Sequence, residues 1–297
     1  MRTPRLVLLL TFLACLSFGA HAEIKPEWTA PLPPFQIADN LYYVGSQDLA
    51  SYLITTPHGN ILLNANLETS PPQIRASIEK LGFHYADIKI LLNSQAHFDH
   101  SAGAAQILRE THARNEVMDA DVPVMETGGR ADFLASSPSI DRYPPAHVDR
   151  ILHDGDTITL GNVTLTAHKT AGHTRGCTTY TFRVHVPGEP ASQLRNVVII
   201  GGDSFWSEYH FIDRPGHPAS YPHIAADFQH TFAVLHALPC DIFLAAHGAQ
   251  FDMLTKLQQL PTQGPKIWID PAGYRDAVND AQETFTTELA KQQAAAR

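Results

Sequence analysis

The stretch that decides the fold is Gln95-Ala96-His97-Phe98-Asp99-His100, which holds two imidazoles, a carboxylate and an amide. All of these groups can bind a metal ion. Residues 88–92 just before it, Ile-Lys-Ile-Leu-Leu, form a short apolar run that is typical of a buried strand. Residues 101–108 after it have the pattern of a helix, with Ser101 as its candidate cap. The stretch is therefore predicted on a strand-to-helix loop, where open sheets commonly place their chemistry.

Two more histidines occur in matching contexts. His173 and His247 each follow a predicted strand and lie beside a glycine. Loops at the ends of neighbouring strands can converge on one edge of a sheet and leave a face open for water and substrate. Asp203, in Gly-Gly-Asp-Ser, is either a bridging ligand or a structural hydrogen-bonding aspartate, and we favour the second. Because the chain has 17 histidines, most of the others are expected to be ordinary surface or core residues.

The rest of the sequence predicts a set of strands and helices that is followed by a second such set, with no linker between the two. This order favours one layered domain, residues 23–297. Residues 25–34 are proline-rich and are expected to run extended over the surface, and the irregular stretch 125–149 is expected to carry a binding loop. The predicted strands are 41–44, 51–55, 60–64, 88–92, 157–160, 163–168, 178–186, 196–201 and 241–246. The further predicted helices are 71–82, 225–238 and 272–295.

Residues 1–22 have the pattern of an export signal. A basic start is followed by an apolar core over residues 6–19 and by the small-residue cleavage site Ala20-His21-Ala22. The apolar run is too short for a comfortable membrane-spanning helix. We therefore expect cleavage after Ala22, a periplasmic location and no stable membrane anchor.

Charge and cysteine content narrow the possible partners. The chain has 21 Lys and Arg against 30 Asp and Glu, a formal net charge of −9, which argues against a nucleic-acid partner. Cys177 and Cys240 are the cysteines that remain after cleavage. The periplasm permits a disulfide, but two buried free thiols are the favoured interpretation. A monomer is also favoured.

The order of these motifs resembles the metallo-β-lactamase superfamily. Residues 88–103, 148–180 and 202–204 are similar to subclass B3 in particular. The resemblance covers nearly the whole mature chain and implies an α/β (α+β) fold, the αββα sandwich, with two adjoining zinc sites. The ligands that it implies are Gln95, His97 and His173 at site one, and Asp99, His100 and His247 at site two.

Gln95 departs from the usual subclass B3 pattern, which has histidine at the start of this motif. The chain resembles the subset with glutamine there. An amide oxygen is a poorer zinc donor than an imidazole nitrogen. We therefore expect site one to bind zinc more weakly than site two, with one or two Zn²⁺ ions per chain.

The activity that the resemblance implies is zinc-dependent hydrolysis of the β-lactam amide bond of penicillins, cephalosporins and carbapenems by a metal-bound hydroxide, which would confer antibiotic resistance. Asp99 would orient the attacking water and carry its proton, besides binding metal. Ser204 and Ser207 are the candidates for binding the substrate carboxylate. Trp206, with its aromatic neighbours, is a candidate for the pocket wall.

Three alternatives remain. A lactonase or a glyoxalase II-type thioesterase of the same fold would more readily use Asp203 as a bridging ligand, but the export signal and the residues around Ser204 favour the β-lactamase. Ser77 and Lys80 match the S-x-x-K motif of serine β-lactamases, but the companion S-D-N and K-T-G motifs are absent. A non-catalytic zinc-binding protein would need a closed ligand shell, whereas these loops predict an open one.

Overall fold

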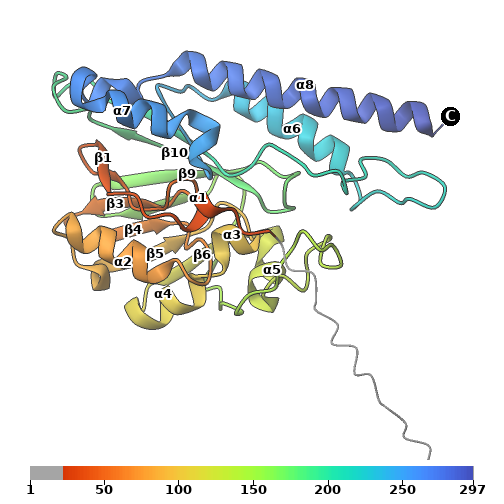
Figure 1. Ribbon diagram of the computed structural model, residues 1–297, viewed down its shortest axis with the longest axis horizontal. Coiled ribbons are helices and arrows are strands. Elements are labelled where there is room, and N and C mark those ends of the chain that lie inside the picture. The colour runs from red at the N-terminus through yellow and green to blue at the C-terminus, as the bar shows by residue number, and fades with distance from the viewer. Residues whose placement is uncertain (1–22, 297) are drawn as a thin grey trace, which may run out of the picture.

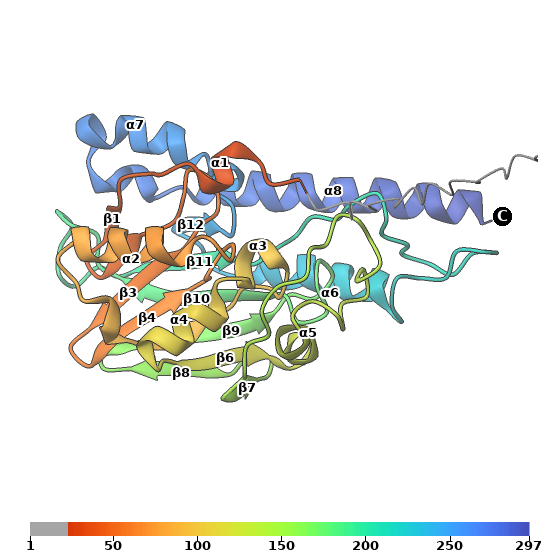
Figure 2. The same ribbon diagram turned by 60° about the horizontal axis from the view of Figure 1, so that its bottom comes forward.

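Two β-sheets pack face to face at the centre of the computed structural model, which describes residues 23–296 (Figure 1). Helices cover the outer face of each sheet, so the layers follow the order helix, sheet, sheet, helix (Figure 2). The αββα sandwich that the resemblance implied is therefore confirmed. The predicted export signal, residues 1–22, lies outside the described residues.

Within residues 23–296 one sheet has seven strands in chain order, and the other has five in the order β12–β11–β10–β9–β8. The first sheet contains β1 (Phe35–Ala38), β2 (Leu41–Tyr43), β3 (Tyr52–Thr56), β4 (Gly59–Leu63), β5 (Ile88–Leu92), β6 (Arg114–Met118) and β7 (Arg150–Leu152). The second contains β8 (Thr157–Leu160), β9 (Val163–Lys169), β10 (Thr178–Val184), β11 (Arg195–Ile200) and β12 (Ile242–Ala245). The α-helices are α1 (Pro26–Thr29), α2 (Pro71–Lys80), α3 (Phe98–Ser101), α4 (Ala104–Thr111), α5 (Val122–Thr127), α6 (Ile224–Ala237), α7 (Met253–Gln263) and α8 (Pro271–Ala295). Short 3₁₀ helices are η1 (Tyr85–Asp87), η2 (Asp119–Asp121), η3 (Gly248–Phe251) and η4 (Pro265–Trp268).

Two hydrophobic clusters hold these layers together. The larger lies between the two sheets and beneath α6 and α8, and it includes Tyr180, Phe228 and Phe285. The smaller lies between the first sheet and α2 and α4, and it includes Ile74 and Ile107. Burial of such side chains is the main stabilising contribution to the fold.

Strand β5 has the bounds that its apolar run predicts. It pairs in parallel with β4 and β6 and is buried along its length except at Lys89. A parallel strand that is covered on both faces has a continuous apolar sequence rather than an alternating one. Its carboxyl end opens into residues 93–97, which places the metal-binding stretch at the edge of the sheet.

Strand β6 was not predicted, because Arg-Asn-Glu-Val-Met shows no regular hydrophobic alternation. Glu116 on this strand is fully buried. Its carboxylate is accommodated there by ion pairs with Arg114 at 2.6 Å and Arg150 at 3.0 Å. The strands β1 and β7 and the helices α5 and α7 were also missed.

Ser101 is not the cap of a helix, and this prediction is wrong. Ser101 is the last residue of α3, and α4 begins only at Ala104. Its hydroxyl donates to the carbonyl oxygen of Gln95 at 2.8 Å and accepts from the Asn93 amide at 2.7 Å. Ser101 therefore braces the loop that carries the metal-binding stretch.

The proline-rich start of the chain also differs from the prediction of an extended arm. Pro26 begins the short helix α1, consistent with the preference of proline for the first helical position. Trp28 on this helix packs against Phe98, with ring centroids 6.3 Å apart. The arm is therefore docked at the edge of the sheet where the metal-binding stretch lies.

The described helices and the two cysteines bear on the predicted membrane anchor and disulfide. None of the described helices combines the length and the apolar character that crossing a membrane requires. Cys177 is buried and Cys240 is half-buried, and both thiols are free. Burial raises the pKa of each thiol above its ordinary value.

Candidate metal centre

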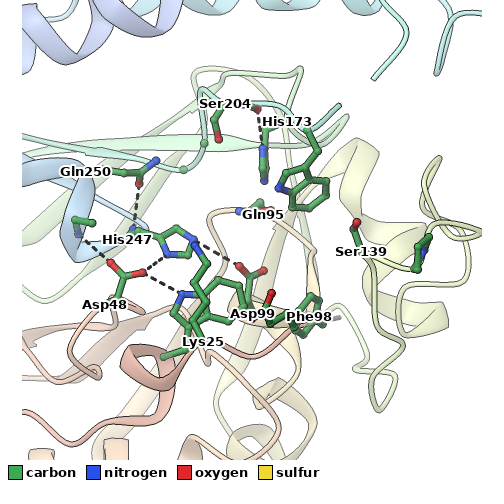
Figure 3. Close-up of a pocket in the computed structure, with 17 residues that line it drawn as sticks. Lys25, Asp48, Gln95, Phe98, Asp99, Ser139, His173, Ser204, His247 and Gln250 are labelled. Carbon is green, nitrogen blue, oxygen red and sulfur yellow. Dashed lines mark hydrogen bonds and ion pairs between the residues drawn. The ribbon is translucent and has the colours of Figure 1, made fainter. Parts of the chain in front are cut away.

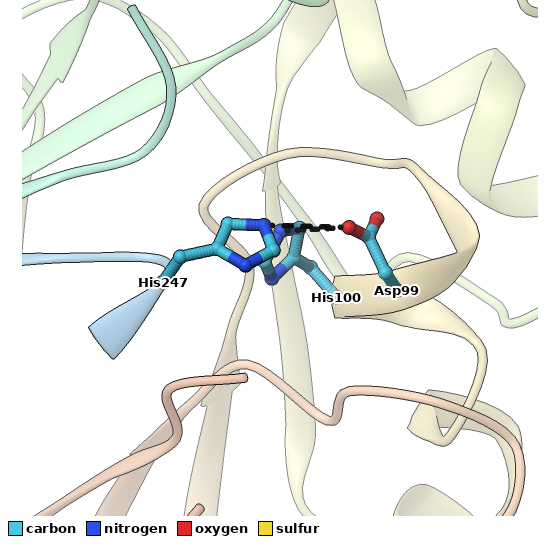
Figure 4. Close-up of side chains that lie close together, drawn as sticks. All are labelled: Asp99, His100 and His247. Carbon is cyan, nitrogen blue, oxygen red and sulfur yellow. Dashed lines mark ion pairs between the residues drawn. The ribbon is translucent and has the colours of Figure 1, made fainter. Parts of the chain in front are cut away.

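Asp99, His100 and His247 form one cluster, as the sequence predicted for loops at neighbouring strand ends. The first two lie on α3, which follows β5 after the loop of residues 93–97, and His247 follows β12. One candidate ligand atom from each residue lies within 4.8 Å of the other two (Figure 4). The Oδ2 atom of Asp99 is 3.4 Å from Nε2 of His100 and 3.5 Å from Nε2 of His247. This set of two imidazoles and a carboxylate matches what zinc binds in catalytic sites.

The orientation of His247 is fixed by Asp48, which the sequence analysis missed. The Asp48 carboxylate accepts hydrogen bonds from Nδ1 of His247 at 2.9 Å, from the Trp28 indole at 3.0 Å and from the backbone of Ala249 at 2.9 Å. Burial opposes ionisation of Asp48, but these hydrogen bonds lower its pKa. A carboxylate that holds the far nitrogen of a ligand histidine is a common feature of metal sites.

The charges around His247 also change its pKa. Burial favours the neutral ring, but the hydrogen bonds and negative charges of Asp48 and Asp99 raise the pKa of His247 to about 9. Without metal, the ring is therefore protonated at neutral pH. A metal ion that binds Nε2 has to displace this proton.

His97 and His173 form a second group beside the first. Nδ1 of His97 lies 3.2 Å from Nε2 of His173. Nδ1 of His173 donates to the carbonyl oxygen of Ser204 at 2.8 Å, which leaves a lone pair on its Nε2. Nε2 of His97 faces Asp132 at 3.4 Å, so the two rings turn their free nitrogens toward each other. Asp132 is a second carboxylate that the sequence analysis missed.

The unpartnered atoms of these residues test whether a metal ion fits. The described residues offer no hydrogen-bond partner to the buried atoms Gln95 Oε1, Asp99 Oδ1, His100 Nδ1 and His100 Nε2. Polar atoms that are buried without a partner destabilise a fold. A bound cation would satisfy those of these atoms that carry a free lone pair, namely the two oxygens and one of the two His100 nitrogens, so the donor set fits a metal ion.

The pKa values of two buried imidazoles also fit a metal-binding site. Burial lowers the pKa of His100 to about 4, against the opposing charge of Asp99. Burial and the neighbouring His97 lower the pKa of His173 to about 3. Both rings are therefore neutral at physiological pH and ready to bind a metal ion.

Asp121 holds the two ligand-bearing loops together. Its buried carboxylate accepts from the backbone of Ala96 at 2.9 Å, from the hydroxyl of Thr174 at 2.7 Å and from the backbone of Gly176 at 2.8 Å. The first contact lies next to His97, and the others lie in the loop of His173. Asp121 thereby sets the distance between the two loops, and no local sequence signal marks it.

Gly172 explains why glycine precedes His173. Its φ of 142° is a conformation that L side chains rarely adopt. A Cβ there would lie 2.8 Å from the ring of Phe228. The loop can therefore pass close to α6 and present His173 only with glycine at this position.

A pocket of about 500 Å³ opens onto both groups of ligands (Figure 3). Gln95, Asp99, His173 and His247 line it, whereas His97 and His100 lie behind this surface, almost fully buried. Pockets of this size bind small molecules. The remaining walls come from residues 23–28, from Pro138 and Ser139 in the irregular stretch, and from the loop that holds Ser204 and Trp206.

The predicted pocket residues on the 203–209 loop divide into two sets. Ser204 and Trp206 line the pocket, and the Trp206 ring stacks on His97 with centroids 5.1 Å apart. Ser207 is not among the lining residues, and its hydroxyl donates to Glu208 at 3.1 Å. Asp203 is buried and belongs neither to the described metal cluster nor to the pocket lining.

Comparison with known proteins places this site in a family. The model of the metallo-β-lactamase superfamily matches residues 49–185. A curated relative, a probable metallo-hydrolase of Burkholderia pseudomallei, is 27% identical over 137 residues. These cover 46% of this chain, and the match spans 44% of the length of that curated relative.

Three solved structures are similar over most of their length. FEZ-1 metallo-β-lactamase from Legionella gormanii is 45% identical over 89% of this chain and 98% of its own, with a TM-score of 0.83. BJP-1, a subclass B3 metallo-β-lactamase of Bradyrhizobium japonicum, is 34% identical, and the match covers 92% of this chain and 99% of BJP-1, with a TM-score of 0.82. The metallo-β-lactamase GOB-18 from Elizabethkingia meningoseptica is 36% identical, and the match covers 91% of this chain and 96% of GOB-18, with a TM-score of 0.81. With this identity, this coverage and a metal centre on the same fold, the chain belongs to the metallo-β-lactamase superfamily and, within it, to subclass B3.

Proposed function

We propose that the protein hydrolyses the amide bond of β-lactam antibiotics. The observation that carries this proposal is the cluster of Asp99, His100 and His247, which lies at the floor of a pocket large enough for a small molecule. Relatives that are 34–45% identical and similar in structure are metallo-β-lactamases. The pocket leaves one side of the cluster open, as a catalytic site requires and a structural metal site does not.

We assign two metal-binding groups to zinc. Asp99, His100 and His247 would hold the stronger ion, and Gln95, His97 and His173 the weaker one, so that one or two ions bind per chain. When bound, zinc polarises a carbonyl group and lowers the pKa of water from ~16 to about 7.

Asp99 is the residue that would handle the proton. Burial opposes its ionisation, but the imidazoles of His100 and His247 hold its pKa far below the ordinary value. Its Oδ2 faces the two imidazoles, and its Oδ1 has no partner among the described residues. Oδ1 can therefore accept a hydrogen bond from the attacking water and orient it toward the carbonyl carbon. It would hold the proton of this water only in passing and give it to the nitrogen as the C–N bond breaks, because so acidic a carboxyl group does not retain a proton.

The pocket walls would position the substrate. Ser204 lies on the wall beside His173 and is our candidate for a hydrogen bond to the substrate carboxylate. Ser207 has no such position, because its hydroxyl is directed to Glu208. Trp206 would supply an apolar face above the metal centre.

Asp203 bears on the alternative of a lactonase or thioesterase of this fold. Those enzymes would more readily use it as a bridging ligand, yet among the described residues Asp203 is not part of the metal cluster. This geometry favours the β-lactamase.

The proposal is tested by assaying a carbapenem and a cephalosporin with purified, zinc-loaded protein before and after chelation. We expect turnover that chelation abolishes and that added zinc restores. Absence of turnover by fully zinc-loaded protein would contradict the proposal and direct the assay to lactones and thioesters. Purification from the periplasm of a chain that starts at Glu23 would test the proposed export and cleavage.

A further inference from the structure

The segment 203–211 brings Ser204 and Trp206 to the pocket wall, although it forms no helix or strand. It lies against α8, where the Phe211 ring is 5.0 Å from the ring of Phe285. A buried segment of this kind has no neighbouring strand to satisfy its backbone N–H and C=O groups, so other groups have to do so. The position of the pocket wall therefore depends on the side chains that take these bonds.

His173 binds this segment at two points. Its Nδ1 donates to the carbonyl oxygen of Ser204 at 2.8 Å (Figure 3). Its own carbonyl oxygen accepts from the hydroxyl of Tyr209 at 2.5 Å. Tyr209 and His173 are both buried. The orientation of His173 and the conformation of the segment therefore depend on each other.

Gln292, near the C-terminal end of α8, holds the far end of the segment (Figure 1). Its side chain is buried. Its Oε1 accepts from the backbone N–H of Phe211 at 2.8 Å, and its Nε2 donates to the backbone carbonyl oxygen of Tyr209 at 2.9 Å. One carboxamide thus bonds to a C=O and an N–H two residues apart, as a residue of a neighbouring β-strand would. Its Nε2 also donates to Glu288 at 3.1 Å, a contact within α8 that fixes the direction of the amide.

We propose that Gln292 is a positioning residue for zinc site one. The inference rests on the proposed function, because it takes His97 and His173 as zinc ligands. The hydrogen bonds run from Gln292 to the backbone of Tyr209, and from the Tyr209 hydroxyl to the backbone of His173. Through them the C-terminal helix holds the loop that turns Nε2 of His173 toward Nδ1 of His97.

This coupling has to act in both directions. If Gln292 favours the position of His173 that binds zinc, then zinc at site one strengthens the contacts of Gln292 by the same factor. Zinc binding should therefore slow hydrogen exchange at the backbone amides of residues 209–211 and of the last turns of α8, residues 286–295. The residues of α8 are not zinc ligands, so this protection would report the coupling itself.

The test variant is Gln292→Met, which removes all three hydrogen bonds of the amide. Methionine has a similar length and helix preference, so α8 should still form. Competition with a chromophoric chelator should show that the affinity of site one falls about threefold to tenfold, less than for the loss of a group bonded directly to a ligand imidazole. The affinity of site two should not change. The protection that zinc gives to residues 286–295 of the unmodified protein should be lost.

Gln293→Met is the matched control, because Gln293 is the exposed neighbour of Gln292 on α8. It should change neither the affinities nor the exchange rates. Equal affinities of site one in the two variants, or an equal loss at both sites in Gln292→Met, would overturn the inference, since a general loss of stability does not select site one. Zinc protection of residues 286–295 that persists in Gln292→Met would also overturn it. Absence of β-lactam turnover would contradict the proposed function alone, because zinc affinity and hydrogen exchange are measured without substrate and still decide the role of Gln292.

Discussion

Asp48 accepts a hydrogen bond from Nδ1 of His247 at 2.9 Å, and this contact turns Nε2 of the same ring toward Asp99. The two residues are 199 positions apart in the chain, and they lie on loops from different sheets. The metal centre therefore depends on how the two halves of the sandwich are joined. Trp28 donates to the same carboxylate, so the N-terminal arm is part of this junction.

Replacing Asp48 with Ala should weaken zinc binding at site two. The ring of His247 would lose the group that fixes its tautomer and orientation, and such losses reduce metal affinity on the order of 10- to 100-fold. Competition with a chromophoric chelator measures the affinity. Asp39→Ala, which removes an exposed carboxylate, should leave it unchanged. Equal affinities of Asp48→Ala and the unmodified protein would show that Asp48 does not support the metal ligand.

Zinc binding at site two should release about one proton per chain near pH 7. The pKa of His247 in the metal-free protein is about 9, so its ring is protonated, whereas the other imidazole of this site, His100, has a pKa of about 4 and is already neutral. Raising the pH removes the competing proton, so the affinity should rise ~10-fold per unit between about pH 6 and 8 and level off above the pKa of His247. Calorimetry in two buffers with different ionisation enthalpies counts the proton. An affinity that is the same at pH 6 and pH 8 would show that zinc does not compete with a proton on His247.

Asp121→Asn should destabilise the protein and loosen site one. The amide of Asn carries donors, so it cannot accept all three hydrogen bonds that Asp121 receives from Ala96, Thr174 and Gly176. A buried donor left without a partner costs about 1–3 kcal/mol of the free energy of unfolding. Denaturant titration of the metal-free protein measures this. Asp154→Asn, at an exposed carboxylate that accepts one backbone hydrogen bond, is the control and should change stability little. Similar stabilities of the two variants would contradict the proposed role of Asp121.

Glu208 holds the irregular stretch against the opposite rim of the pocket. Its carboxylate accepts from the hydroxyls of Ser139 at 2.8 Å and Ser137 at 3.3 Å, which places Pro138 and Ser139 in the pocket wall. Glu208→Ala should raise KM about threefold to tenfold, with kcat nearly unchanged, because losing the hydrogen bonds that hold this wall should cost roughly 1 kcal/mol of substrate binding. Backbone amides of residues 131–140 should exchange faster in hydrogen-exchange measurements. The control is Glu283→Ala on the exposed face of α8, and exchange rates as slow in Glu208→Ala as in this control would refute the contact.

The sequence predicted the parts of this protein that are encoded locally. The apolar run of β5 and the ligands that follow it lie within residues 88–100, so periodicity and residue type were sufficient to place them. His173 and His247 could be predicted because each follows a strand and lies next to a glycine. The family resemblance then supplied the αββα arrangement that brings these loops together.

The supporting carboxylates could not be predicted in this way. Asp121 and Gly176 are 55 positions apart, and an aspartate in a short 3₁₀ helix resembles any surface aspartate in sequence. Asp48 and Asp132 also acquire their roles only through contacts made by the folded chain. Ser101 was misplaced for a related reason, because its hydroxyl is used by the loop of Gln95 rather than by a helix.

Gln95→His should strengthen zinc binding at site one. Gln95 is buried, lines the pocket beside His173 and has an Oε1 atom without a hydrogen-bond partner among the described residues. An imidazole nitrogen is a better zinc donor than an amide oxygen, so the affinity of site one should rise at least about tenfold. After dialysis against a weak chelator, metal analysis should find close to two zinc ions per chain in Gln95→His and fewer in the unmodified protein. Gln36→His, which adds a histidine at an exposed position of β1, controls for non-specific binding and should not change the zinc count. If Gln95→His retains no more zinc than this control, Gln95 does not occupy a ligand position, and the weaker site would have to be built from His97 and His173 alone.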